Sequence, residues 1–377
     1  MVPPEISLEE ALEKLKSCFF QLPDPRIERC REHPLENVLL IAICAVLCGT
    51  NYWTEVELFG KAKRSFFERF LDLEHGIPSH DTFGRVFSAL DSALFGQCFT
   101  DWVKSCFAIP PGSSLNFDGK TICGSHDRVN GKKKGAHIVS AWVNELGICF
   151  AQQKVDEKSN EITAIPEVLN MLEIENCVVT IDAMGCQTAI ASLIRDKKAD
   201  YILAVGGNQP SLEEEVRLIF DVKAPEEQAQ TLEKDHGRID TRTISVIRDL
   251  EWVEGKERWK DMSCVIRVES KREFQNKTES HERFFISSMK GTAKELLKRI
   301  RGHWAIENNL HWCLDVGFRE DESRVRVGNA TENFAILRKW ALNLLKQDKK
   351  LKVGIESKRK NAGWNEEYLA HLLLKLL

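Results

Sequence analysis

In the first part of the chain, residues 1–108, apolar positions recur among polar ones with the period of an α-helix. Apolar residues lie three or four apart, after a plausible cap, in SLEEALEKLKSCF, PLENVLLIAICAVLCG, TEVELFGKAKRSFFERFL and SHDTFGRVFSALD. This pattern predicts a helical N-terminal domain. The last of these helices starts at Ser79 and has a polar face with His80, Thr82 and Arg85, which fits either a DNA-reading helix or a packing helix.

From residue 109 onward the pattern changes to strands mixed with helices. Residues 115–122, 136–144 and 147–155 have strand-like patterns of apolar residues. The segments that follow are predicted to be a helix, a strand, a second helix and a further strand. The order β-β-β-α-β-α-β predicts an α/β mixed sheet of the ribonuclease H type, although other α/β folds begin in the same way.

The rest of the chain breaks this alternation. Residues 206–290 look like a helix followed by antiparallel strands, which indicates a β-rich insertion. Helical patterns return after it, so we expect a catalytic domain over 109–345. Residues 346–377 are predicted to form a basic C-terminal tail and helix.

Composition changes this picture only locally. The chain of 377 residues has 53 basic and 57 acidic side chains, a net charge of −4, so any contact with nucleic acid must come from local patches. Two candidate patches are Lys132 to Lys134 and residues 346–360, where seven basic and two acidic residues give +5, and both also fit solvated segments. The 12 cysteines show no paired spacing and no apolar run is long enough for a membrane span, which predicts a cytoplasmic protein.

Two acids lie where predicted strands end. Asp118 is in LNFDGK and Asp182 is in VVTIDAMG. Each is next to apolar residues that predict a buried strand. The carboxyl edge of an α/β sheet is where ligands bind, and two carboxylates there favour a divalent metal ion. Both acids are equally explained as turn-capping residues.

A third acid lies in the helix that follows the insertion. Four apolar residues of this helix are spaced to face the core: Ile306, Leu310, Cys313 and Leu314. Another face carries His303, Glu307 and His311, and it can turn Glu307 toward the two aspartates. Three carboxylates can hold two Mg²⁺ ions for phosphodiester chemistry. A zinc site at the histidines and a solvated acid on the helix surface remain alternatives.

At these residues the sequence resembles a known family. FDGKTICGS, TIDAMGCQ, YILAVGGNQ, HGRIDTR, RFFISS and the block from RGHWAIENNLHW to ILRKWALNLLK are similar to the ISAs1 family of insertion-sequence transposases, which includes the H repeat-associated proteins. The likeness spans nearly the whole chain.

The resemblance implies a ribonuclease H-like domain with Asp118, Asp182 and Glu307 as the catalytic, metal-binding DDE acids. The implied cofactor is Mg²⁺ or Mn²⁺, as two ions, and the implied chemistry is hydrolysis at the transposon ends followed by strand transfer to target DNA. It also implies a homodimer on DNA, in a bacterial cytoplasm where the protein joins the nucleoid. Candidate DNA or supporting contacts are Lys120, Arg238, His303, Asn308, His311, Arg85, Asn208 and Gln209.

One departure concerns the broader IS4 superfamily, whose helix has a Tyr, an Arg and a Lys around the Glu. This chain has Ile300, His303 and Leu314 at those positions, so those DNA contacts do not carry over. Trp252 and Trp259 of the insertion fit either base stacking or, more simply, the core. Two rival functions remain: a catalytically inactive DNA-binding relic of a transposase, and a metal nuclease that does not join strands.

Overall fold

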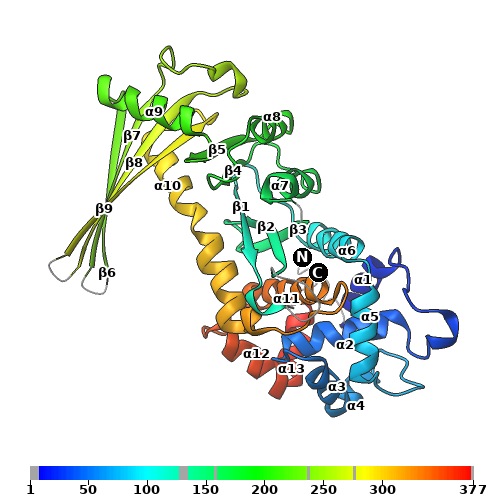
Figure 1. Cartoon of the computed structure of the whole chain (residues 1–377). Coiled ribbons are helices and arrows are strands. Elements are labelled where there is room, and N and C mark those ends of the chain that lie inside the picture. The colour runs from blue at the N-terminus through cyan, green and yellow to red at the C-terminus, as the bar shows by residue number, and fades with distance from the viewer. Residues whose placement is uncertain (1–7, 127–134, 157–158, 236–237, 275–276, 375–377) are drawn as a thin grey trace, which may run out of the picture.

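The computed structural model describes residues 8–126, 135–156, 159–235, 238–274 and 277–374. Figure 1 shows a helical part at one end and a sheet with flanking helices in the middle. At the other end, the long strands within residues 227–287 form an arm. The predicted basic patch at Lys132 to Lys134 lies outside the described residues. No helix in the described ranges has the length and hydropathy needed to span a membrane.

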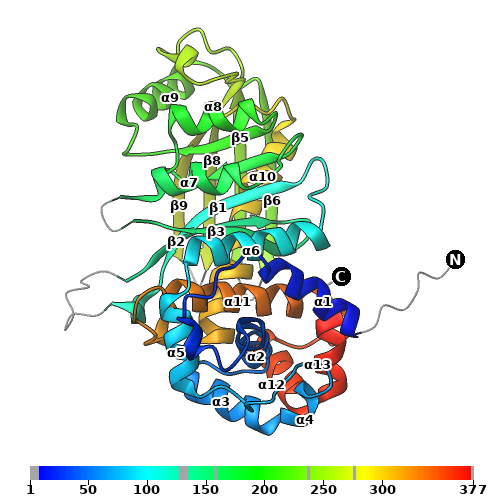
Figure 2. The same ribbon diagram turned by 90° about the vertical axis from the view of Figure 1, so that its right-hand side faces the viewer.

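The helical part is built around one apolar helix. Its elements are α1 (Leu8–Phe19), α2 (Leu35–Leu47), α3 (Trp53–Ala62), α4 (Arg64–Phe67), α5 (His80–Ala89) and α6 (Ser92–Cys106). Helix α2 is apolar on all sides, and a helix of that kind is stable only when other elements surround it. Figure 2 shows α2 nearly end-on, with helices from both ends of the chain around it. The predicted helical N-terminal region is confirmed.

The central sheet has the predicted ribonuclease H-like order. Its strands are β1 (Ser114–Thr121), β2 (His137–Val143), β3 (Ile148–Lys154), β4 (Val178–Ile181) and β5 (Asp200–Val205), with helices α7 (Glu161–Asn170) and α8 (Thr188–Asp196). These strands lie in the order β3-β2-β1-β4-β5. Strands β1 and β4 are parallel, as are β4 and β5, whereas β2 is antiparallel to both its neighbours.

The insertion extends this sheet. It consists of α9 (Pro210–Val222), β6 (Glu227–Asp235), β7 (Arg238–Ile247), β8 (Cys264–Phe274) and β9 (Lys277–Ser287). Strand β9 pairs antiparallel with β5, so the insertion and the core strands form one nine-stranded sheet. Strand β6 is not among the predicted strands, because its residues EQAQTLEKD are polar and have no strand-like apolar alternation.

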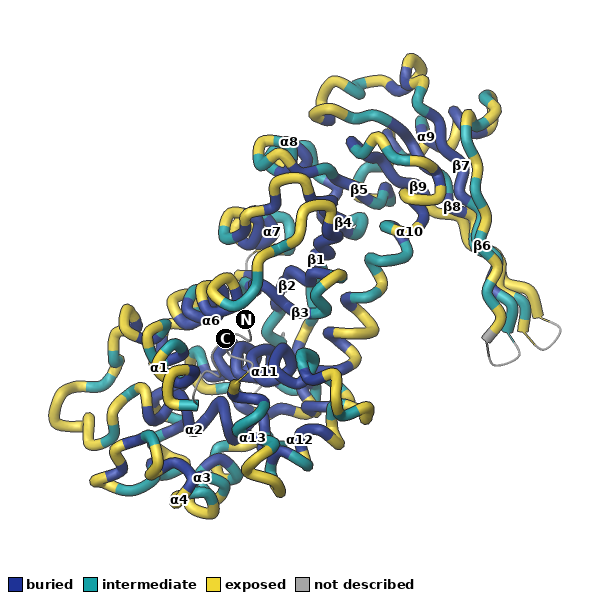
Figure 3. The backbone as a smooth tube through the Cα atoms, turned by 180° about the vertical axis from the view of Figure 1, so that it is seen from behind, coloured by how far each residue is buried: buried dark blue, intermediate teal, exposed yellow. Residues whose placement is uncertain are grey.

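The C-terminal third of the chain returns to the sheet and then to the helical part. Helix α10 (Ala293–His303) packs on β1, β4, β6 and β7, while α7 packs on β2 and β3 from the other face (Figure 1). Helix α11 (Ala330–Gln347) contacts β3 as well as α2, α5 and α6, and Figure 3 shows it buried along its length. Helices α12 (Ile355–Trp364) and α13 (Glu366–Leu373) close the chain, and two basic side chains of α12, Lys358 and Arg359, are buried.

Candidate metal centre at the end of the central strands

The register of two parallel strands places the aspartates together. Phe117 of β1 is opposite Ile181 of β4, so the next residue in each segment is an acid: Asp118 within β1 and Asp182 directly after β4. The backbone N–H groups of Met184 and Gly185 donate hydrogen bonds of 3.1 and 3.4 Å to Asp182 Oδ1, which fixes this carboxylate in the turn after β4.

The third acid lies in an unusual helical segment. Helix α10 starts at a capping box formed by Thr292 and Glu295 and ends at His303, and residues Glu307–His311 and Cys313–Gly317 are π-helical. The predicted helical segment is confirmed, but two stretches of it are π-helical rather than α-helical. The wider turn still buries the predicted apolar face, Ile306, Leu310, Cys313 and Leu314. Single π-helical stretches within helices are frequent at functional sites.

Asp118 is the common member of two groups of potential metal ligands. One group is Asp118, Glu307 and His311, and the other is Asp118, Glu161 and Asp182. Within each group the ligand atoms lie within 4.8 Å of one another. The structure thus brings together all three predicted acids, with Asp118 in the middle.

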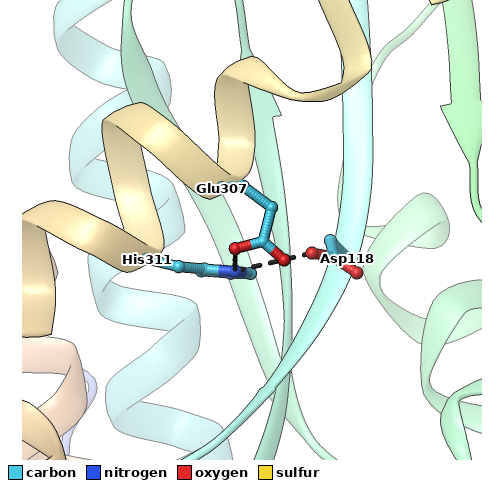
Figure 4. A group of neighbouring side chains, drawn as sticks. All are labelled: Asp118, Glu307 and His311. Atoms are coloured by element: carbon cyan, nitrogen blue, oxygen red, sulfur yellow. Dashed lines mark ion pairs between the residues drawn. The ribbon is translucent and has the colours of Figure 1, made fainter. Parts of the chain in front are cut away.

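Histidine 311 fills the space between two of the acids. Figure 4 shows its ring beside Glu307 and Asp118, and Nδ1 lies 3.4 Å from both Asp118 Oδ2 and Glu307 Oε2. The ring is buried, and its Nε2 has no hydrogen-bond partner among the described residues. Burial lowers the pKa of His311 to about 4, so the ring is neutral at pH 7 and Nδ1 or Nε2 has a free lone pair.

The carboxylates repel one another in a partly desolvated place. Burial, followed by the charge of Glu307, raises the pKa of Asp118 to about 8, and this side chain is only 14% exposed. Burial and then the charge of Glu161 raise the pKa of Asp182. Negative charge that the chain itself leaves uncompensated favours binding of an external cation.

The donor set fits a hard divalent cation. Carboxylate oxygens with one imidazole nitrogen suit Mg²⁺ or Mn²⁺, whereas structural zinc sites typically use cysteine thiolates and several histidines. Neither group contains a cysteine. The alternative of a zinc site at the two histidines is also disfavoured by geometry, because His303 is not in either group.

A pocket of about 400 Å³ opens beside these acids. Its lining includes Asp118, Asp182 and Glu307 together with Arg283 and Trp304. The Trp304 ring is exposed, and the Arg283 guanidinium lies 4.9 Å from its centre. The pocket therefore joins an acidic wall to a cationic, aromatic wall.

Three of the predicted DNA or supporting contacts form hydrogen bonds within the protein at the site, and a contact with DNA stays a prediction for each. His303 Nδ1 lies 2.9 Å from Thr180 Oγ1 on β4, and burial lowers the pKa of His303 to about 4. Asn208 donates to the carbonyl of Ala183, and Gln209 donates to that of Cys186 at 2.9 Å. Both amides thus support the turn that carries Asp182.

Lys120 is engaged within the protein. Its Nζ lies 2.7 Å from Asp321 Oδ1, 2.8 Å from Asp315 Oδ1 and 3.7 Å from Glu320 Oε2, and the side chain is 12% exposed. This cluster ties β1 to the second π-helical stretch and to the segment that follows it. A contact between Lys120 and DNA stays a prediction.

The other predicted DNA contacts occupy separate places. Asn308 is exposed next to Glu307. Arg238 starts β7 at the free end of the arm, where its Nε lies 3.0 Å from Asp240 Oδ2 (Figure 1). Arg85 is exposed on α5, whose predicted cap is confirmed because Ser79 Oγ accepts from the Thr82 N–H at 3.3 Å.

The tryptophans of the insertion differ from each other. Trp259 is buried in the core, as the simpler prediction held. Trp252 is exposed, so a core role for this residue is wrong, and Lys223 Nζ lies 5.5 Å from the centre of its ring.

One acid of the centre was missed from the sequence. Glu161 is the first residue of α7 and belongs to the group with Asp118 and Asp182. The only local signal was its place directly after Asn160, the helix cap, at the start of the helix that follows the third strand.

A ribonuclease H-like sheet with a carboxylate cluster at the ends of its central strands defines the nuclease and transposase class of enzymes. The family profile described as Transposase DDE domain matches residues 83–344, and the one described as DDE_Tnp_1-associated matches residues 16–103. The chain therefore belongs to the Transposase DDE domain family, and it is a DDE transposase.

Full-length relatives agree with this family. The chain is 41% identical to "Putative transposase YncI" of Escherichia coli O157:H7, covering 96% of this chain and 95% of the relative. It is 39% identical to "H repeat-associated putative transposase YhhI" of Escherichia coli K12, covering 96% and 98%. The solved piggyBac transposase synaptic complex with hairpin DNA is a weaker match, with a TM-score of 0.43 and 10% identity over 97% of this chain and 78% of that one.

Proposed function

We propose that the protein cuts DNA at the ends of an insertion sequence and joins the freed 3′-hydroxyl to target DNA. The observation that supports this most directly is the convergence of Asp118, Asp182 and Glu307 in a chain of the Transposase DDE domain family. We assign these three acids the catalytic, metal-binding roles.

The proposed cofactor is Mg²⁺ or Mn²⁺, as two ions. Asp118, Asp182, Glu307 and His311 would be the residues that hold them, because their ligand atoms gather around Asp118. When bound, such ions activate the attacking oxygen and stabilise the leaving oxygen of a phosphodiester.

His311 and several neighbouring residues also hold the three acids in place. His311 is neutral and buried against Asp118 and Glu307, so its ring limits the positions open to both carboxylates. Thr180 and His303 tie α10 to β4, and the Lys120 cluster ties β1 to the segment after Glu307. The three acids therefore come from elements that are bonded to one another.

DNA reaches the centre, in this proposal, along the pocket that contains Trp304 and Arg283. Asn308 is exposed beside it and is available to a phosphate or a base. The helical region of residues 1–108, with Arg85 on its exposed surface, and Arg238 on the arm are proposed to contact more distant DNA. We expect a homodimer when two transposon ends are bound, in the cytoplasm on the nucleoid.

The test is cleavage of labelled linear DNA that carries the element's ends with flanking sequence, in Mg²⁺. Wild type is compared with Glu307→Gln and with Glu322→Gln, a matched change of an exposed acid that pairs with Arg319. We expect end-specific cuts and joined products with wild type and Glu322→Gln only. Binding to the ends without cleavage in Mg²⁺ or Mn²⁺ would instead establish an inactive relic, and cuts without joining would establish a nuclease.

A further inference from the structure

Glu161 approaches the centre from the opposite face to Glu307. It begins α7, which packs on the β2–β3 side of the sheet, whereas Glu307 follows α10 on the other side. The Asn160 side chain caps α7 by accepting from the Ile162 N–H at 3.1 Å. This cap determines where the helix starts, and so it places the Glu161 side chain at the edge of the sheet beside Asp118 and Asp182.

A chain of hydrogen bonds orients the Glu161 carboxylate. His137 Nε2 lies 2.7 Å from Glu161 Oε1, and His137 Nδ1 lies 2.7 Å from Thr121 Oγ1. An ionised carboxylate only accepts, so Nε2 donates to Glu161, and in the neutral ring Nδ1 accepts from the Thr121 hydroxyl. Metal-binding side chains are commonly held by a second layer of hydrogen bonds of this kind.

Strand β1 leaves space for the side chains of Glu161 and His137. A Cβ atom at Gly119 would lie 2.5 Å from both His137 Nε2 and Glu161 Cδ, which no side chain can tolerate without movement of the pair. Gly119 directly follows Asp118 in β1. The backbone next to the central acid is therefore shaped around Glu161 and His137.

The second oxygen of Glu161 has no partner. Oε2 is buried and has no hydrogen-bond donor among the described residues, although the whole side chain is 15% exposed. Its carboxylate is within 4.8 Å of ligand atoms of Asp118 and Asp182. An unpaired buried carboxylate oxygen between two other acids is costly unless a cation neutralises it.

We propose that Glu161 is a fourth acid of the metal centre, which binds the cation shared by Asp118 and Asp182, and that His137 is its positioning residue. The inference rests on the proposed function, because it concerns the same centre. Its alternative is that Glu161 only stabilises the start of α7 and pairs with His137.

The first test measures Mn²⁺ binding to the purified full-length protein without DNA, by electron paramagnetic resonance of free Mn²⁺. Glu161→Gln keeps the size of the side chain and removes its charge, and Glu167→Gln is the control at an exposed position of the same helix. We expect Glu161→Gln to weaken at least one Mn²⁺ site about tenfold or more, and Glu167→Gln to leave it unchanged. Equal binding by wild type and Glu161→Gln would overturn the inference.

The same variants separate this inference from the proposed function. If wild type binds Mn²⁺ but does not cut transposon ends, the function fails while Glu161 is still judged from Mn²⁺ affinity. If wild type cuts, Glu161→Gln should need a higher Mg²⁺ concentration for half-maximal cleavage. Absence of any Mn²⁺ site in wild type would overturn both proposals.

The role of His137 is tested by a conservative pair. His137→Gln retains an N–H near the position of Nε2, whereas His137→Leu has a similar volume and no donor. We expect His137→Gln to keep Mn²⁺ affinity close to wild type and His137→Leu to lose several-fold, with melting temperatures recorded for both. Equal affinities of the two variants would remove the positioning role.

Discussion

Two well-buried aspartates of this protein have opposite surroundings. Asp118 in the central sheet is 14% exposed and its nearest charged neighbours include Glu307, Glu161 and Asp182; burial and these acids raise its pKa to about 8. Asp240 in the arm is 8% exposed, and there burial is outweighed by Arg272, Arg238 and Arg242, which hold its pKa below the usual range.

The difference separates structural charge from functional charge. In the arm, the chain supplies the cations, with Arg238 Nε and Arg272 Nε at 3.0 and 3.1 Å from the Asp240 carboxylate, so nothing else is needed. In the centre, the chain places acid against acid, and the basic side chain that the described residues place beside Asp118 and Glu307 is His311, whose lowered pKa leaves it neutral. Such an arrangement persists when it serves a ligand that carries the missing charge.

The largest expected effect is on the central acid itself. Asp118→Asn removes the carboxylate that both ligand groups share, so we expect end cleavage to fall about a thousandfold, equivalent to about 4 kcal/mol in the activation barrier. Single-turnover cleavage of labelled ends measures it. A variant within tenfold of wild type would break the comparison, because Asp118 would then be no more than a buried acid.

The Lys120 cluster is an intermediate case, where Lys120 is the cationic partner of Asp315 and Asp321 and shares Glu320 with Arg338. Lys120→Met should lower the free energy of unfolding by about 2 kcal/mol, a discounted figure because Asp315 and Asp321 are partly exposed and Glu320 keeps Arg338 as a partner. Urea denaturation provides the value, and Lys120→Arg is the control that retains the charge. Unchanged stability of Lys120→Met would show that the acids are solvated enough to need no partner.

The pH dependence of stability should differ between the two aspartates. The pKa of Asp118 rises from its ordinary value of 3.8 to about 8 on folding, so the folded state binds this proton more tightly than the unfolded state. Its contribution to stability in the absence of metal is therefore greatest at low pH and is lost as the pH rises toward about 8.

Thermal unfolding in EDTA between pH 5 and 9 tests this sign. In Asp118→Asn, the melting temperature should fall less steeply with rising pH than in wild type. Added Mn²⁺ should raise the melting temperature of wild type more at pH 8 than at pH 6, because metal and proton compete for the same carboxylates. If the melting temperature of Asp118→Asn fell with pH as steeply as that of wild type, the pH dependence would belong to other ionisable groups.

The smallest expected effect is in the arm. Asp240→Asn should lower the free energy of unfolding by about 1 to 2 kcal/mol, a discounted figure because its arginine partners are partly exposed. Since the folded pKa of Asp240 is lowered, its contribution is present at neutral pH and is lost as the pH falls through the acid range. Mn²⁺ affinity should not change, and a change would contradict the separation of the two regions.

Local patterns in the sequence predicted much of this architecture. Helical periodicity identified the N-terminal helices and the apolar face of Ile306 and Leu310, and the strand order predicted the sheet topology. Acids next to apolar strand ends identified Asp118 and Asp182. These features depend on neighbours within a few residues, so the sequence alone contains them.

Other features of the centre depend on contacts between distant residues. Glu161 is 43 positions from Asp118 in the printed sequence, and it becomes part of the site because α7 packs on β2 and β3 and Gly119 of β1 leaves room for it. The burial of His311 and the ion pairs of Lys120 with distant acids likewise arise from packing. Even β6, a polar strand, forms because β7 offers it a complete edge of backbone hydrogen-bonding groups.

The amino-acid sequence by itself therefore determined which elements form, in which order, and which acids end the central strands, because periodicity and strand ends are local properties. Only the tertiary structure decided which acids meet a lysine or arginine and which are left facing one another. The physical reason is that a buried charge is governed by whatever lies within a few ångströms, and in this sheet those neighbours come from chain segments tens to hundreds of residues apart.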